Sequence, residues 1–269
     1  MKFENTKVYN FEGALHGMRN AKESWSKSDS FWEEDTCIRF GDKECTKHYV
    51  IGENDMRLAQ SLIRAGSEHR KFLRQIFVSV DITAPLFWWK EFDTYKVGTV
   101  ANSTSTMHKI ASKPITLECF ETDDFEPELS TELKDGDKTF HFLTQCEVNC
   151  QIDFLESLRR KHLEYDEKSK NKEKYTESER MHFKRAAKKC WKELIRWLPE
   201  SWLQTRTVTM TYENLFAMCS KGQRRFHKLN EWSGVDNQEL TNFISWARKL
   251  PYAKEFIFID EEKTINGSN

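Results

Sequence analysis

Two long stretches in the second half of the chain carry apolar residues at helical spacing. The first lies within 147–165, and the second runs from Phe183 to Leu198. Thr176 and Glu179 match a capping box at the start of the second stretch, and the charged run 168–174 predicts a turn before it. The sequence therefore predicts two long amphipathic helices joined by a short connection.

Two further segments have the patterns of strands. Residues 76–82 alternate between apolar and polar side chains, and residues 205–211 are rich in β-branched side chains. Residues 7–11 also alternate, which indicates a third strand near the N-terminus.

Shorter helices are predicted around these strands. One helix should begin at a cap formed by Asn54 or Asp55 and should end at Ala65, before Gly66. Others are predicted at 14–22, at 86–95 after Pro85, at 212–220, and from a cap pattern at Asp236 and Glu239 to just before Pro251.

The remaining segments have weaker patterns. Residues 1–50 are poorly assigned, with 24–35 expected as a loop; 98–109 is expected as a loop or helix start, and 112–140 as acidic and irregular. Strands and helices mix without a βαβ rhythm or an internal repeat. We therefore expect an α+β fold: a single domain of residues 1–269 with a mixed sheet and long helices.

The charges are balanced over the whole chain, with 42 Lys and Arg against 43 Asp and Glu. This balance argues against a protein that is basic over its whole surface, so a nucleic-acid partner is not expected, although a local basic groove stays open. A basic run from Lys221 to Arg225, with Lys228, is interpreted as a solvated face.

The seven cysteines are scattered and form no Cys-x-x-Cys pair. Cys146 and Cys150 lie four residues apart and would make only half of a metal site. We therefore expect reduced thiols and no metal. The sequence also has no apolar run of about 18 residues and no apolar secretory stretch after Met1, so we expect no membrane span and a cytoplasmic location.

The short catalytic motifs are absent: the sequence has no GxGxxG, no GxxxxGK[ST] and no HExxH. An ordered series of residues takes their place. It begins with Glu68-His69-x-x-Phe72 and a strand, continues through residues 85–105, and ends with Leu198-Pro199, Thr205-Arg206 and His227-x-x-x-Glu231.

This series resembles the flavin-dependent thymidylate synthase family over residues 54–250. That family has a Glu-His-x-x-Phe segment, an Arg-His-Arg triplet followed by Ser and Asn positions, and a late Thr-Arg strand. Here the triplet is Thr94-Tyr95-Lys96, the first Ser is Thr99, and the closing Arg is Met107. Ammonium and hydroxyl groups lack the bidentate fork of Arg, so binding of phosphate should be weaker.

The resemblance implies roles for seven residues. Asn102, Ser105 and Arg206 are expected to bind a pyrimidine nucleotide, and His69, Tyr95, Lys96 and His227 are expected to contact FAD. It also implies folate as a methylene donor and a homotetramer with pockets shared between subunits. The catalytic residues stay unassigned.

Each candidate also has a structural interpretation. His69 would be a buried histidine, Ser105 a helix cap, Arg206 a surface ion pair, and His227 with Glu231 a helical pair. Trp88 and Trp89 are expected to lie in the core rather than to stack on a ligand.

Three functions remain open on the sequence. The favoured one is a divergent flavin-dependent enzyme that methylates a pyrimidine nucleotide at C5. The second is a catalytically silent protein that binds or sequesters a nucleotide. The third is an interaction module for protein or nucleic acid that reuses the fold.

Overall fold

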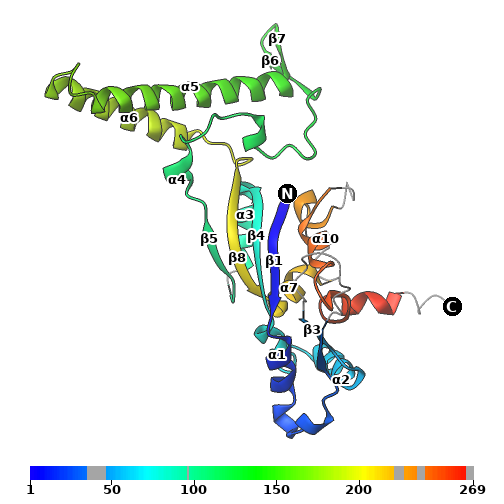
Figure 1. Cartoon of the computed structure of the whole chain (residues 1–269). Coiled ribbons are helices and arrows are strands. Elements are labelled where there is room, and N and C mark those ends of the chain that lie inside the picture. Colours follow the sequence, from blue (N-terminus) through cyan, green and yellow to red (C-terminus); the bar gives the residue numbers. More distant parts are fainter. Residues whose placement is uncertain (35–46, 96, 221–226, 235–239, 265–269) are drawn as a thin grey trace, which may run out of the picture. The chain divides into compact units, whose positions relative to one another are not determined.

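The computed structural model describes the chain except residues 35–46, 96, 221–226, 235–239 and 265–269 (Figure 1). The chain divides into two compact units. The hairpin unit comprises Met1, Thr83–Lys90 and Ser103–Thr205. The sheet unit comprises Lys2–Ile82, Glu91–Asn102 and Arg206–Asn269.

A four-stranded sheet has the strand order β1-β4-β8-β5. Its strands are β1 (Lys2–Tyr9), β4 (Phe77–Pro85), β8 (Leu203–Thr211) and β5 (Val100–Ser103). Val78, Val80 and Ile82 are fully buried on β4 and alternate with more exposed residues, because successive strand side chains point to opposite faces. The strands predicted at 76–82 and 205–211 are therefore confirmed, and the one predicted at 7–11 lies earlier, in β1.

The sheet unit contains mostly short helices. The α-helices are α1 (Phe11–Met18), α2 (Glu53–Ala65), α7 (Tyr212–Cys219), α9 (Asn230–Ser233), α10 (Phe243–Ala247) and α11 (Ala253–Phe256). The 3₁₀ turns are η1 (Asn20–Lys22), η2 (Trp25–Lys27), η3 (Lys71–Gln75), η4 (Asp93–Tyr95) and η6 (Ile259–Thr264). Strands β2 (Phe31–Glu34) and β3 (Lys47–Val50) form an antiparallel pair.

Two helix predictions in this unit are confirmed, and one loop prediction is wrong. The helices predicted to end at Ala65 and to begin at Tyr212 are confirmed. The segment 24–35 is not only a loop, because it contains β2. The cap pattern at Asp236 and Glu239 lies outside the described residues, and Asn242 caps α10.

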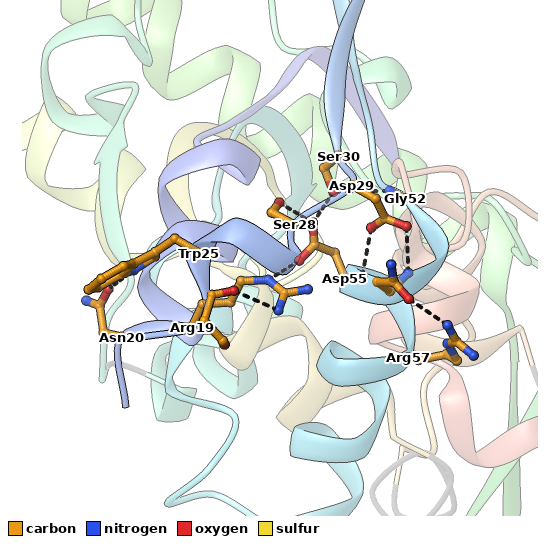
Figure 2. Close-up of polar contacts among 11 residues, drawn as sticks. Arg19, Asn20, Trp25, Ser28, Asp29, Ser30, Gly52, Asp55 and Arg57 are labelled. Carbon is orange, nitrogen blue, oxygen red and sulfur yellow. Dashed lines mark hydrogen bonds and ion pairs between the residues drawn. The ribbon is translucent and has the colours of Figure 1, made fainter. Parts of the chain in front are cut away.

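The start of α2 differs from the prediction. Gly52 is the N-cap, so neither Asn54 nor Asp55 caps the helix. Instead, the carboxylate of Asp29 accepts hydrogen bonds from the backbone N–H groups of Asn54 and Asp55, at 2.9 and 3.1 Å (Figure 2). A side chain distant in the sequence thus satisfies the free N–H groups of the first turn.

Asp55 is fully buried in this network. It accepts hydrogen bonds from Arg19 Nε, Ser28 Oγ and Ser30 Oγ, each at 2.6 Å (Figure 2). Burial by itself would raise the pKa of Asp55, but the serine hydrogen bonds and the Arg19 guanidinium outweigh it and hold the pKa below its ordinary value. The N-terminal segment is therefore anchored to α2 by a buried ion pair.

The hairpin unit is dominated by two long helices, α5 (Thr144–Lys170) and α6 (Glu177–Arg196), which pack side by side (Figure 1). Leu155 of α5 and Leu194 of α6 are fully buried in one apolar cluster with Ile110, Ile115 and Phe120. The capping box of Thr176 and Glu179 is present at the start of α6. Both predicted long helices are confirmed, and the first is longer at each end than its stripe indicates.

The other elements of this unit are short. They are η5 (Leu117–Cys119), α4 (Thr106–Lys109), and the antiparallel strands β6 (Ser130–Asp135) and β7 (Lys138–Leu143). The prediction that 112–140 is irregular is wrong for β6 and β7. All twelve residues of these strands are exposed, so no buried face marks them in the sequence. The segment 98–109, predicted as a loop or helix start, contains the start of α4 as predicted and also the strand β5, which was not predicted.

Helix α3 (Leu86–Phe92) follows β4 directly and continues into η4, as predicted for 86–95. Trp88 and Trp89 are fully buried and pack edge to face, which confirms that they lie in the core. None of the described helices combines the length and the apolarity that crossing a bilayer requires. The overall class is α+β, as predicted.

Candidate functional site

Side chains from four segments of the sheet unit meet around the end of α3 and the turn η4. Glu91, Asp93 and Tyr95 come from α3 and η4, Arg206 comes from β8, and His227 precedes α9. We call these five residues, together with Trp232 of α9, the η4 cluster. It contains three of the residues predicted from the sequence to bind a ligand.

Arg206 is paired with a carboxylate of η4. Its Nη1 donates to Asp93 Oδ1 at 3.0 Å. The Arg206 side chain is 16% exposed and that of Asp93 is 45% exposed, so the pair lies at the surface of the unit. Asp93 therefore orients a guanidinium whose planar fork suits phosphate or carboxylate groups.

His227 is buried and held at both ring nitrogens. Its Nδ1 lies 3.1 Å from Glu91 Oε1, and its Nε2 lies 3.0 Å from the carbonyl oxygen of Met218. The carboxylate of Glu91 and the carbonyl oxygen of Met218 therefore fix the orientation of the ring from both sides. Its ring also stacks on Trp232, with centroids 4.5 Å apart and planes 9° apart.

Tyr95 completes the aromatic part of the cluster. Its ring contacts Trp232 edge to face at a centroid distance of 5.8 Å, and it lies 6.5 Å from the ring of His227. Phe92 stacks on the same indole at 6.4 Å. Trp232 and Phe92 are buried, whereas Tyr95 is partly exposed, so Tyr95 is the ring of this group that a ligand can reach.

The other predicted nucleotide-binding residues lie elsewhere. Asn102 is exposed on β5. Ser105 belongs to the hairpin unit, where its hydroxyl caps α4 by accepting from the N–H of His108 and also bonds the His108 ring at 2.7 Å. The helix-cap interpretation of Ser105 is therefore confirmed.

The other predicted cofactor contacts are less closely grouped. His69 lies exposed in the turn after α2, so the alternative of a buried histidine is wrong. The adjacent Arg70 is held by both carboxylate oxygens of Glu213, at 3.0 Å each, and stacks over Phe216. Lys96 lies outside the described residues.

The helical pair of His227 and Glu231 is not formed as predicted. His227 lies before α9, which starts at Asn230, so the two residues do not share a helix. Both are buried, and the partner of His227 in the structure is Glu91. The basic run 221–225 falls outside the described residues.

The sequence analysis missed three members of the cluster: Glu91, Asp93 and Trp232. The two carboxylates stand directly before the altered triplet, in Lys90-Glu91-Phe92-Asp93, and that run of charge was the available signal. Trp232 has no comparable signal, because a single tryptophan in a polar stretch does not reveal its neighbours. In the described part of the chain, no three His, Cys, Asp or Glu side chains gather closely enough to hold a metal ion.

Comparison with known proteins identifies the fold. No family model and no curated protein matches the sequence. Among solved structures, a flavin-dependent thymidylate synthase ThyX from Helicobacter pylori, complexed with FAD and dUMP, matches with a TM-score of 0.51 and 15% identity. The match covers 97% of this chain and 99% of that one.

A second structure of the Helicobacter pylori enzyme, also with FAD and dUMP, gives a TM-score of 0.50 at 13% identity over 94% of this chain and 95% of that one. The UMP/dUMP methylase PolB from Streptomyces cacaoi, bound with 5-Br dUMP, gives 0.42 at 13% identity over 81% and 77%. The likeness to the two ThyX structures shows that the chain has the fold of flavin-dependent thymidylate synthases.

Proposed function

We propose that this chain is a divergent member of the flavin-dependent thymidylate synthase family that methylates a pyrimidine nucleotide at C5. Two observations support the proposal: the likeness of fold to a ThyX structure extends over nearly the full length of both chains, and Asp93 holds the guanidinium of Arg206 in the η4 cluster, which also contains the partly exposed ring of Tyr95. The orientation of Arg206 by Asp93 is the observation that carries it.

In this proposal Arg206 donates to the phosphate of the nucleotide. A phosphate and Asp93 would share the planar guanidinium, which offers five N–H donors. Asn102 and Ser105 are proposed as further polar contacts to the nucleotide. Ser105 would have to exchange its cap bond to His108 for that role.

Three residues that the resemblance names suit a flavin by their chemistry: Tyr95 offers a phenol ring for the ring system, and His69 and Lys96 offer an imidazole and an ammonium for polar groups. We propose that these three residues contact FAD. His227 is buried, so it acts through Tyr95 and Trp232 by holding their rings in place. FAD, when bound, supplies the hydride, and a folate supplies the methylene group.

The second candidate, a silent nucleotide-binding protein, is favoured by one specific observation. Thr94 replaces a cation of the family triplet, and the guanidinium of Arg206 already faces the carboxylate of Asp93. The positive charge available to bind a phosphate is therefore smaller than the family's Arg-His-Arg triplet would supply. In either case we propose a cytoplasmic homotetramer.

Titration with dUMP tests the role of Arg206. Arg206→Ala should weaken dUMP binding by about 1.5–3 kcal/mol, the value of a charged hydrogen bond. Arg248→Ala is the matched control, because Arg248 is also paired with a carboxylate, Glu261, in the same unit. Equal dUMP affinity in the Arg206 variant and the wild type would remove Arg206 from the site. The absorbance of flavin in the purified protein separates the enzyme from the silent binder.

A further inference from the structure

Helix α6 carries a row of basic residues at intervals of four. Its members are Arg180, Lys184, Lys188, Lys192 and Arg196. Each step rises about 6 Å and turns about 40° around the helix axis, so the row extends about 24 Å along the helix and turns by about 160° over that length. Arg185 and Lys189 flank it. We call these seven residues the α6 basic face.

Five of the seven cations of this face lack the carboxylate partners that neutralise several cations on α5. Over the described residues, neither the three central lysines nor Arg185 and Lys189 form an ion pair or hydrogen bond, and all five are exposed. By contrast, Arg160, Lys168 and Lys170 of α5 each pair with a carboxylate on their own helix.

Few carboxylates lie on α6 itself. Glu177 and Glu179 lie in the first turn, where Glu179 bonds Thr176, and Glu193 lies near the far end, where it pairs with Arg196. The balanced charge of the whole chain therefore conceals a strongly positive surface along the middle of α6. Such a surface attracts an anionic partner.

The opposite side of α6 limits the kind of partner. Ala187 and Leu194 are buried there, and Leu194 shares a core with Leu155 of α5. Because the apolar side of α6 is buried in this core, the helix cannot insert that side into a bilayer as an interfacial helix does. The centres of protein interfaces are depleted in lysine and favour aromatic anchors. On the described part of α6 the exposed large apolar residue is Met181, so this face has little to offer a protein partner.

We propose that the α6 basic face binds the phosphate backbone of a nucleic-acid duplex without sequence preference. A duplex carries one negative charge per about 1.7 Å of its axis, so a row about 24 Å long always faces several phosphates. Because the row winds around the helix, about three of its cations contact a straight duplex at once. This binding is separate from the η4 cluster and independent of the proposed nucleotide chemistry.

The test is fluorescence anisotropy with a labelled 20-base-pair DNA duplex. Three phosphate contacts predict binding about 40-fold weaker at 200 mM than at 50 mM salt. The triple variant Lys184→Gln, Lys188→Gln and Lys192→Gln should lose at least about tenfold in affinity at 50 mM salt and most of the salt dependence. Helical content and melting temperature should match the wild type, because these exposed side chains form no ion pair or hydrogen bond among the described residues.

The matched control is the triple variant Arg160→Gln, Lys168→Gln and Lys170→Gln. This variant removes the same number of positive charges, but from α5 cations that are already paired with carboxylates. Its affinity for the duplex should stay within about twofold of that of the wild type. The proposal would be overturned if both triple variants lost affinity for the duplex equally, or if the wild type did not bind the duplex at 50 mM salt. Anionic vesicles and polyglutamate are the competing probes; equal binding of either one through α6 would overturn the assignment to nucleic acid.

Discussion

Removing the carboxylate of Asp55 should strongly destabilise the sheet unit. Asp55 is fully buried, and Arg19, which is 5% exposed, donates to it at 2.6 Å. In Asp55→Ala the guanidinium would stay buried without its counter-charge, and the hydroxyls of Ser28 and Ser30 would lose their acceptor. Breaking a buried pair from one side costs about 3–5 kcal/mol, a large part of the total stability of a domain.

Urea unfolding followed by circular dichroism measures this loss, and amide hydrogen exchange of α1 and α2 locates it in the sheet unit. Glu164→Ala is the matched control, since Glu164 forms an exposed pair with Lys168 and its removal should change the stability little. Adding Arg19→Met to Asp55→Ala should recover part of the loss, because it removes the unpaired charge.

The pH dependence provides an independent check. The folded state holds the pKa of Asp55 below its ordinary value of 3.8, so the pair contributes its stability above about pH 4. That stability is lost as the pH falls through the folded pKa. The difference in unfolding free energy between the wild type and Asp55→Asn should therefore become smaller at acidic pH. An Asp55→Ala variant no less stable than Glu164→Ala would refute the reasoning.

Three further predictions concern the remaining parts of the molecule. Hydrogen bonding from Arg159 lowers the pKa of Glu156 from 4.5 to about 2. Glu156→Gln should therefore lower the unfolding free energy by up to about 3 kcal/mol at pH 7. Calorimetry should show this difference disappearing as the pH falls from about 4.5 to about 2. Light scattering should give the mass of an oligomer; a clean monomer would exclude pockets shared between subunits. Replacing residues 94–96 by Arg-His-Arg should increase flavin binding, because Arg supplies a charged bidentate fork that Thr lacks. The absorbance of the bound flavin measures this change, and an unchanged absorbance would show that residues 94–96 do not contribute to flavin binding.

Much of the secondary structure could be predicted because it depends on local pattern. The α6 capping box uses residues three apart, and the buried alternation of β4 repeats every second residue. Strands β6 and β7 escaped prediction for the opposite reason: their side chains are all exposed, and their pairing joins residues such as Leu133 and Phe140 without a buried face.

The candidate site was predicted only in part. Arg206, Tyr95 and His227 were identified by their order along the chain, and the structure brings them together around η4. Their immediate partners, Asp93 and Glu91, could not be assigned from the sequence. A carboxylate in a charged stretch has the same local pattern whether it faces water or a guanidinium.

The sequence by itself determined the long helices, the central strands and the α+β class, because period and capping act over a few residues. Tertiary structure decided which charges are buried and paired. Asp55 was expected at a helix start, and only the fold shows that Asp29 caps α2 while Asp55 binds Arg19, 36 residues away. Burial removes water from such a pair, and no local pattern in the sequence records which distant side chain replaces that water.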